Sequence, residues 1–228
     1  KILKLNNFKI NMNNKKVVVF GSSGLIGSYL INYLLSDPTF KQIVLVTRRP
    51  LSISHEKIRN QIINFSSKSQ INRSIKNCCI VFSAIGTTKA KVKNNKKKYR
   101  EIDFDINFNI AKCCKINNVN KFILVSSSGA NAKSSNFYLR LKGEIEHEIN
   151  KLNLNSFIVF RPSLLLGNRN EFRLGERIGQ VILPFFSKIL PPNIKPVHAK
   201  LVAKAMIFYS KSNILGNNII SNKKILKV

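Results

Sequence analysis

The stretch VVVFGSSGLIGSYLI, residues 17–31, decides the fold of this chain. Its first part is apolar throughout, like a buried strand, and its last part has apolar residues at helical spacing. Between them, glycines recur as G-x-x-G-x-x-G at Gly21, Gly24 and Gly27. A helix start offers unpaired backbone N–H groups, and glycines let a phosphate approach them without a side chain in the way. The stretch therefore predicts the phosphate-binding turn of a dinucleotide-binding sheet.

Strand patterns and amphipathic helix patterns alternate along the rest of the chain. This alternation predicts an α/β fold, a doubly wound parallel sheet with helices on both faces. Residues 15–228 are expected to form one domain, in which 167–228 build a small C-terminal lobe on the substrate side, and 1–14 an N-terminal extension. We expect strands at 16–20, 42–47, 61–65, 78–84, 121–126 and 156–161, and later helices near 98–116, 136–151 and 198–211.

The chain carries 39 Lys and Arg against 10 Asp and Glu, a formal net charge of +29. A charge of this size is typical of proteins that bind nucleic acid. The lysines are spread along the whole chain, however, and Asn and Ile are abundant too, which is the composition that AT-rich codons produce. We therefore expect no specific nucleic-acid partner. No apolar run approaches the roughly 20 residues of a membrane span, so we expect no membrane span either.

The four cysteines stand as two adjacent pairs, Cys78-Cys79 and Cys113-Cys114. Neighbouring residues rarely bridge each other, and neither pair has the spacing of metal ligands. The sequence therefore predicts small buried thiols in a reducing compartment, no metal site and a cytoplasmic location.

Tyr138 and Lys142 stand four residues apart, so a helix would carry both on one face. A free phenol has a pKa near 10, and a neighbouring ammonium group favours its ionised form. Such a tyrosine can act as acid or base for a carbonyl–alcohol pair, while the lysine also bonds a cofactor ribose. Ser126 and Ser127 end an expected strand, where a serine can donate a hydrogen bond to a substrate oxygen. A polar turn is the alternative interpretation of these serines.

Arg48 and Arg49 follow the second expected strand. NAD-selective sites place an acidic residue there to hold the ribose 2′-hydroxyl. Arginine suits a 2′-phosphate instead, so the sequence predicts NADP(H) as the cofactor. The alternative is that both arginines are solvated surface residues of a basic protein.

Four further stretches resemble one known family: SAIGTT at 83–88, SSSGAN at 126–131, KGEIE at 142–146 and RPSLLLG at 161–167. Over residues 15–210 the chain resembles the atypical short-chain dehydrogenase/reductases. It is most similar to their Tat-interacting-protein-like oxidoreductase branch and its bacterial NAD(P)H-binding relatives. The resemblance implies a Rossmann fold with NADPH across the strand ends. It implies phosphate contacts by Gly21, Ser23, Gly24 and Gly27, 2′-phosphate contacts by Arg48 and Arg49, and adenosine-side contacts by Ile85 and Gly86. Leu25, Ile26 and Thr87 are further expected cofactor contacts. It also implies catalysis by Tyr138 and Lys142 and cofactor contacts by Arg161, Leu165 and Arg173.

The favoured function is an NADP(H)-dependent oxidoreductase that acts on a small-molecule carbonyl or alcohol, as a monomer or homodimer. A non-catalytic NADPH-sensing or scaffold protein is the alternative, because one fold serves many functions. The Ser/Tyr/Lys set favours the enzyme, since a sensor needs no general acid. A sugar-nucleotide epimerase is disfavoured, because such enzymes usually carry a larger C-terminal domain.

Overall fold

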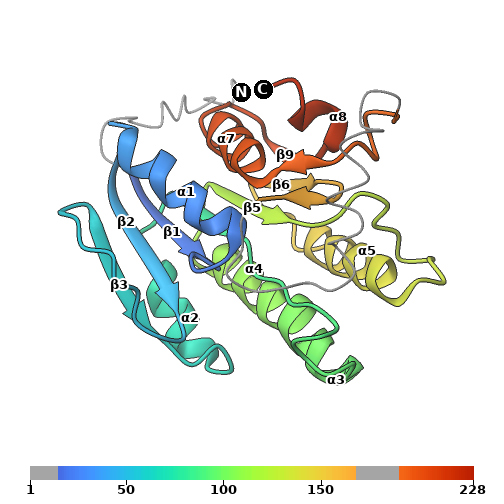
Figure 1. The fold of residues 1–228 in the computed structure, drawn as a ribbon. Helices are drawn as coiled ribbons and strands as arrows, with labels where there is room; N and C mark the ends of the chain where they lie inside the picture. The colour runs from blue at the N-terminus through green and yellow to red at the C-terminus, as the bar shows by residue number, and fades with distance from the viewer. Residues whose placement is uncertain (1–14, 168–189) are drawn as a thin grey trace, which may run out of the picture.

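A seven-stranded sheet in which every pairing is parallel forms the centre of the molecule (Figure 1). The structure is a computed structural model that describes residues 15–167 and 190–228. The strand order is β3-β2-β1-β4-β5-β6-β9. The strands are β1 (Lys15–Phe20), β2 (Phe40–Thr47), β3 (Ile58–Ile62), β4 (Ile80–Ser83), β5 (Lys121–Val125), β6 (Ser156–Arg161) and β9 (Gly216–Ser221).

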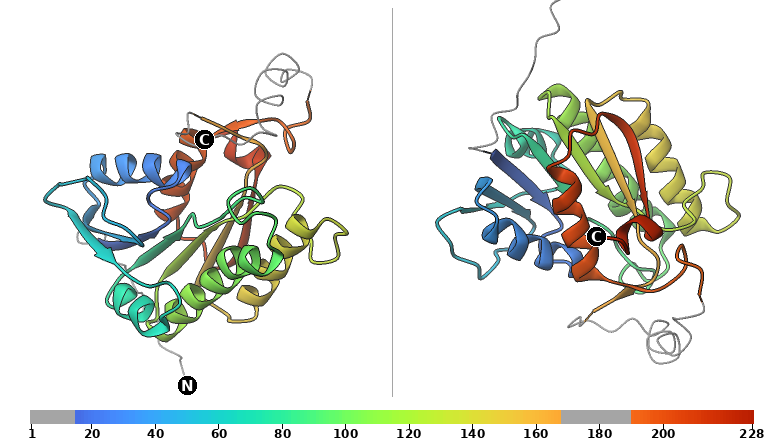
Figure 2. Two further views of the ribbon diagram at one scale, coloured as in Figure 1. Left: turned by 60° about the horizontal axis from the view of Figure 1, so that its bottom comes forward. Right: turned by 90° about the horizontal axis from the view of Figure 1, so that it is seen from above.

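Helices cover both faces of this sheet (Figures 1 and 2). One face carries α1 (Leu25–Ser36), α7 (Ala199–Ser210) and α8 (Asn222–Ile225), and the other carries α2 (Lys68–Ile75), α4 (Ile106–Ile116) and α5 (Phe137–Asn150). A short helix α3 (Lys96–Arg100) and a π-helical turn η2 (Glu101–Asp105) lead into α4. A second, two-stranded sheet joins β7 (Leu165–Leu166) to β8 (Val197–His198). Among the described helices, none is long and apolar enough to cross a membrane.

The two apolar cores lie on opposite faces of the sheet, and β1 contributes to both. Val18 and Phe20 pack into the core under α2, α4 and α5. Val17 and Val19 pack into the core under α1 and α7. Successive strand side chains point to opposite faces, so a strand buried on both faces must be apolar throughout. This requirement explains the unbroken VVVF run and confirms the predicted doubly wound parallel sheet.

The strand order reverses between β1 and β4, because β2 and β3 lie on one side and β5, β6 and β9 on the other. Ligands of open α/β sheets bind at the carboxyl ends of the strands at this reversal. The glycine turn follows β1 and the Ile85–Thr87 segment follows β4, so the fold places both predicted cofactor segments at that edge.

Several elements differ from the sequence predictions, and two of the differences have a clear physical reason. The third strand, expected at 61–65, is Ile58–Ile62, because Ile43 and Thr47 of β2 set its register. Strand β9 was not expected, since its sequence GNNIIS has no strong strand pattern. An edge strand exposes one side to solvent and tolerates polar residues, so its sequence signal is weak. It brings part of the predicted C-terminal lobe into the central sheet beside β6.

Candidate functional site

The glycine turn after β1 is closely packed. Gly21 has a φ of +82°, and a Cβ there would lie 2.7 Å from the carbonyl carbon of Ala84. A Cβ at Gly27 would overlap the carbonyl oxygen of Gly21. Both positions therefore require glycine. Helix α1 begins after Gly24 without a side-chain cap and has no acidic residue in its first turn. Its first amides are thus left for an anion, which the helix dipole also favours.

A cavity of about 600 Å³ lies at the carboxyl ends of β2 and β3. Arg48, for which the sequence predicts a 2′-phosphate contact, contributes to its wall. Arg49 is exposed and does not contribute to this wall. The remaining lining residues come from the β3–α2 segment and from α3, η2 and α4, and were not predicted: Ile62, Ile63, Asn64, Phe65, Ser66, Gln70, Lys98, Glu101, Ile102 and Ile106.

Tyr138 and Lys142 lie on one face of α5, as their spacing predicted. Asn136 caps this helix, its side chain accepting hydrogen bonds from the Tyr138 and Leu139 amides. The Lys142 ammonium lies 6.0 Å from the centroid of the Tyr138 ring. The Tyr138 ring also makes an edge contact with Tyr99 of α3, at 6.3 Å between centroids. The pair is therefore held at the sheet edge between α5 and α3.

Lys142 forms a buried ion pair with Asp103 of η2. The two atoms, Nζ and Oδ1, are 2.8 Å apart, and the side chains are 6% and 1% exposed. The other oxygen of Asp103 accepts a hydrogen bond from the Thr87 amide at 2.7 Å. Gly86 adjoins this pair, since a Cβ there would lie 3.4 Å from Oδ1 of Asp103. The predicted catalytic lysine and the predicted adenosine-side loop therefore meet at one carboxylate.

Burial and charge act in opposite directions on Lys142. Burial by itself lowers the pKa of this lysine, because a charged group loses hydration. The negative charge of Asp103, the interaction with the Tyr138 hydroxyl group, the hydrogen bond to Asp103 and the charge of Glu146 outweigh that effect, and the pKa of Lys142 lies above its ordinary value. Lys142 is thus a cation at neutral pH in spite of its burial.

A second buried carboxylate, Glu146, lies one helical turn beyond Lys142 on α5. It accepts a hydrogen bond from the Ser126 hydroxyl at the end of β5. It also forms an ion pair with the Arg161 guanidinium at the end of β6, whose Nε lies 3.1 Å from Oε2. Two of the predicted site residues, Ser126 and Arg161, are therefore bonded to each other through Glu146. The Ser127 hydroxyl instead donates a hydrogen bond to the Ser128 carbonyl oxygen, at 3.3 Å.

The remaining predicted residues are placed as follows. Ser23, Leu25 and Ile26 lie in the glycine turn and the start of α1, and Ile85 and Thr87 follow β4. Leu165 lies in β7 and packs at the edge of the core under α1 and α7. Arg173 lies outside the described residues.

Asp103 and Glu146 were missed by sequence reasoning for different reasons. Glu146 repeats the spacing of Tyr138 and Lys142 on the same helix, a signal that could have found it. Asp103 belongs to a distant segment and becomes part of the site only through tertiary contact. The π-helical turn that carries it is a feature often found at functional sites.

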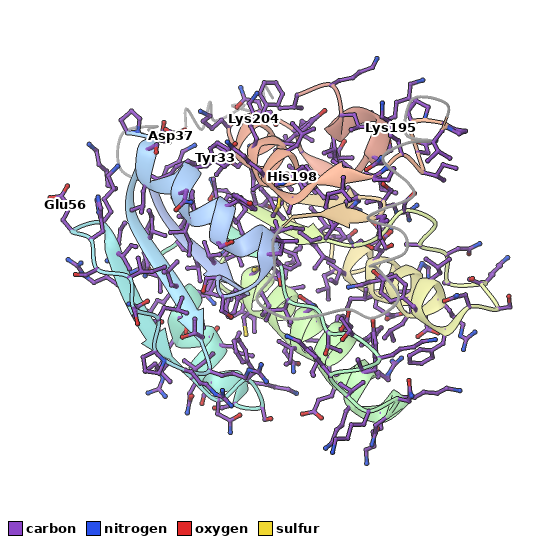
Figure 3. All side chains as sticks on the ribbon, in the orientation of Figure 1. Tyr33, Asp37, Glu56, Lys195, His198 and Lys204 are labelled. Atoms are coloured by element: carbon purple, nitrogen blue, oxygen red, sulfur yellow. The ribbon has the colours of Figure 1, made fainter. Side chains whose placement is uncertain are left out.

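Buried charge also gathers at the opposite, amino edge of the sheet. Lys121 begins β5 and donates hydrogen bonds to the Ser210 and Ser212 carbonyls at the end of α7. Burial lowers its pKa to about 8, and the positive charge of Lys15 acts in the same direction. Asp37, labelled at the far end of α1 in Figure 3, pairs with Lys211 at 2.7 Å. These contacts close the end of α7 and belong to the scaffold.

The residues at the carboxyl edge fit a dinucleotide cofactor. A Cβ at Gly21 or Gly27 would fill the space in the glycine turn, and the first amides of α1 have no side-chain cap. Arg48 lines a cavity large enough for an adenosine. In the part of the chain that the structure describes, no group of His, Cys, Asp or Glu is placed to hold a metal ion.

Fold and site together define a dinucleotide-binding protein of the Rossmann type. Residues 21–181 match the NAD(P)H-binding family, and the chain belongs to that family. It is 34% identical over 204 residues to the mitochondrial protein FMP52 of Candida albicans, covering 87% of this chain and 89% of that protein. It is 32% identical over 168 residues to protein HTATIP2 of Rattus norvegicus, covering 72% of this chain and 69% of that protein. These relatives confirm the predicted resemblance to the Tat-interacting-protein-like branch.

Solved structures with the same fold are more distant in sequence. MoeE5 in complex with UDP-glucuronic acid and NAD aligns with a TM-score of 0.70 at 16% identity, over 90% of this chain and 75% of that chain. The UDP-glucose 4-epimerase of Thermus thermophilus in complex with NAD aligns with a TM-score of 0.68 at 16% identity, over 93% and 81%. At this identity the likeness establishes the fold alone.

The predicted cytoplasmic location is wrong. The FMP52 relatives of Candida albicans, Scheffersomyces stipitis and Candida glabrata are all named mitochondrial, which points to mitochondria. The prediction rested on cysteines that are free in the structure. Free thiols indicate reducing surroundings and carry no information on which compartment provides them.

Proposed function

We propose that this protein is an NADP(H)-dependent oxidoreductase that interconverts a carbonyl and an alcohol, with Tyr138 as the general acid or base. The observation that carries the proposal is the placement of Tyr138 beside a charged, buried Lys142 at the edge where the glycine turn ends. The bound nicotinamide supplies or accepts the hydride. A cofactor sensor would have no use for a general acid in this position.

In the reducing direction, Tyr138 donates its hydroxyl proton to the substrate oxygen, and the positive charge of Lys142 stabilises the phenolate that remains. Lys142 also bonds the cofactor ribose. Ser127 donates a hydrogen bond to the same substrate oxygen. We assign this role to Ser127 because the Ser126 hydroxyl is donated to the buried Glu146, whereas the Ser127 hydroxyl makes only a 3.3 Å hydrogen bond to the Ser128 carbonyl.

We propose NADP(H) over NAD(H) because Arg48 lines the cavity at the end of β2, where an NAD-selective site would place an acid. A 2′-phosphate would form a charge-assisted pair with the guanidinium. Arg49 gives a second cation nearby.

The test is hydride transfer from NADPH to a panel of carbonyls and quinones, followed by absorbance. Tyr138→Phe removes only the hydroxyl, so turnover should fall by about 100-fold or more while NADPH affinity stays unchanged. Lys142→Ala should lower both. Tyr33→Phe, on α1 (Figure 3), is the matched control and should change neither.

Two results contradict the proposal. Turnover that survives Tyr138→Phe excludes the mechanism. Binding of NADPH without hydride transfer to any carbonyl, alcohol or quinone would favour the non-catalytic sensor.

A further inference from the structure

The ammonium group of Lys142 lies where water cannot solvate it. The side chain is 6% exposed, and its nearest charged partner is the Asp103 carboxylate at 2.8 Å. A buried amine without a counter-charge tends to lose its proton, because burial penalises the charged form. The state of this lysine therefore depends on the groups that face it.

Asp103 is the only carboxylate bonded to Lys142 among the residues that the structure describes. Tyr138 and Glu146 face the lysine from its own helix. The Glu146 charge is already paired with Arg161 and accepts from Ser126. The loop after β4 approaches with glycine and backbone groups, Gly86 and the Thr87 amide. The positive charge of Lys142 is thus balanced mainly by the Asp103 carboxylate of η2.

The position of the Asp103 carboxylate is fixed by several elements. Its Oδ2 accepts from the Thr87 amide at 2.7 Å. Its backbone carbonyl accepts from Nδ2 of Asn107 at 3.0 Å, and Oδ1 of Asn107 accepts from the Ser83 hydroxyl at 2.5 Å. The side chains of Asp103, Asn107 and Ser83 are all buried. The π-helical turn η2 is therefore held to β4 and its loop, with the carboxylate directed at Lys142.

We propose that Asp103 is a positioning residue of the catalytic site, which keeps the buried Lys142 charged and holds it beside Tyr138. The effect of Asp103 on turnover rests on the proposed function, whereas its effect on the charge of Lys142 does not. When Tyr138 gives its proton to the substrate oxygen, the phenolate persists only beside an ammonium. Without Asp103, a proton on Lys142 would return to the phenolate, and the pair would become a phenol and a neutral amine.

A cofactor-free experiment tests the charge. The free energy of unfolding is measured in urea from about pH 7 to about pH 10 for the wild type, Asp103→Asn and the double variant Asp103→Asn/Lys142→Met. In the wild type, Lys142 keeps its proton in both states up to its ordinary pKa of 10.5. In Asp103→Asn, folded Lys142 releases its proton earlier than the unfolded chain does, so stability rises with pH.

The difference in free energy of unfolding between the wild type and Asp103→Asn should therefore narrow as the pH rises. The difference between the wild type and the double variant should not narrow in this way. A difference between the wild type and Asp103→Asn that stays constant with pH overturns the proposal. If Asp103→Asn does not fold, a titration of Lys142 in the wild type tests whether this buried lysine stays charged. The Lys142 amine, followed by NMR of labelled lysine and assigned with Lys142→Arg, should then keep its proton up to pH 10.5, and a lower midpoint refutes the proposal.

The catalytic part is tested by turnover, with Asp105→Asn as the matched control, since Asp105 is an exposed acid in the same turn. Asp103→Asn should lower kcat by about tenfold or more at neutral pH. The loss should shrink at lower pH, where Lys142 regains its proton. A loss that is equal at every pH indicates a structural role only. If no substrate is turned over at all, the proposed function fails, while the unfolding experiment still decides the charge.

Discussion

Replacing Glu146 by Gln should destabilise the fold and loosen the site at once. The substitution keeps the shape of the side chain and removes its charge. Gln can still accept from Ser126, but it can no longer neutralise Arg161, whose Nε and Nη2 both bond the carboxylate. The guanidinium at the end of β6 is then left without its partner.

The magnitude follows from burial. The Glu146 side chain is 8% exposed and Arg161 is 27% exposed. Breaking a fully buried pair costs about 3–5 kcal/mol, because the remaining charge stays desolvated. Arg161 keeps some access to water, and Gln keeps one neutral hydrogen bond, so we expect a loss of about 2 kcal/mol. For an m-value of roughly 2 kcal/mol/M, the urea midpoint falls by about 1 M.

The assay is urea unfolding followed by circular dichroism, with NADPH affinity measured on the same variants. Glu148→Gln is the matched control, because Glu148 lies on the same helix and pairs with Lys151 at the surface, at 2.7 Å. It should leave the midpoint unchanged. Glu146→Gln should also weaken NADPH binding, because the Glu146 carboxylate connects Ser126 at the end of β5 to Arg161 at the end of β6. A midpoint equal to that of Glu148→Gln would refute the reasoning.

Two further predictions concern the cofactor and the scaffold. Arg48→Ala combined with Arg49→Ala should reduce the preference for NADPH over NADH by about tenfold through weaker NADPH binding, and equal affinities in the unmutated protein would exclude the assignment. Because burial lowers the pKa of Lys121 from 10.5 to about 8, the folded state binds fewer protons than the unfolded state between these values. Stability should therefore gain up to about 3 kcal/mol from this group as the pH rises from about 8 to 10.5. Lys121→Gln should lose that rise in urea unfolding, and an unchanged pH slope would contradict the shift.

The sequence by itself determined the fold class and the local motifs. The VVVF run predicted a parallel sheet, because a strand buried on both faces must be apolar throughout. The glycine turn predicted a phosphate-binding site, because only glycine lets the backbone approach so closely. The spacing of Tyr138 and Lys142 placed both on one helix face, because helical geometry is local. Such signals depend on neighbouring residues and are visible in a short window of sequence.

Only the tertiary structure decided which charges meet. Asp103 faces Lys142, and Glu146 joins Ser126 to Arg161, through contacts between separate elements. Residue type and spacing do not reveal which acid becomes buried beside which base, because burial is set by the packing of whole helices on the sheet. The exposed edge strand β9 escaped prediction for a related reason: its place is fixed by pairing with β6, while its own sequence carries little apolar pattern.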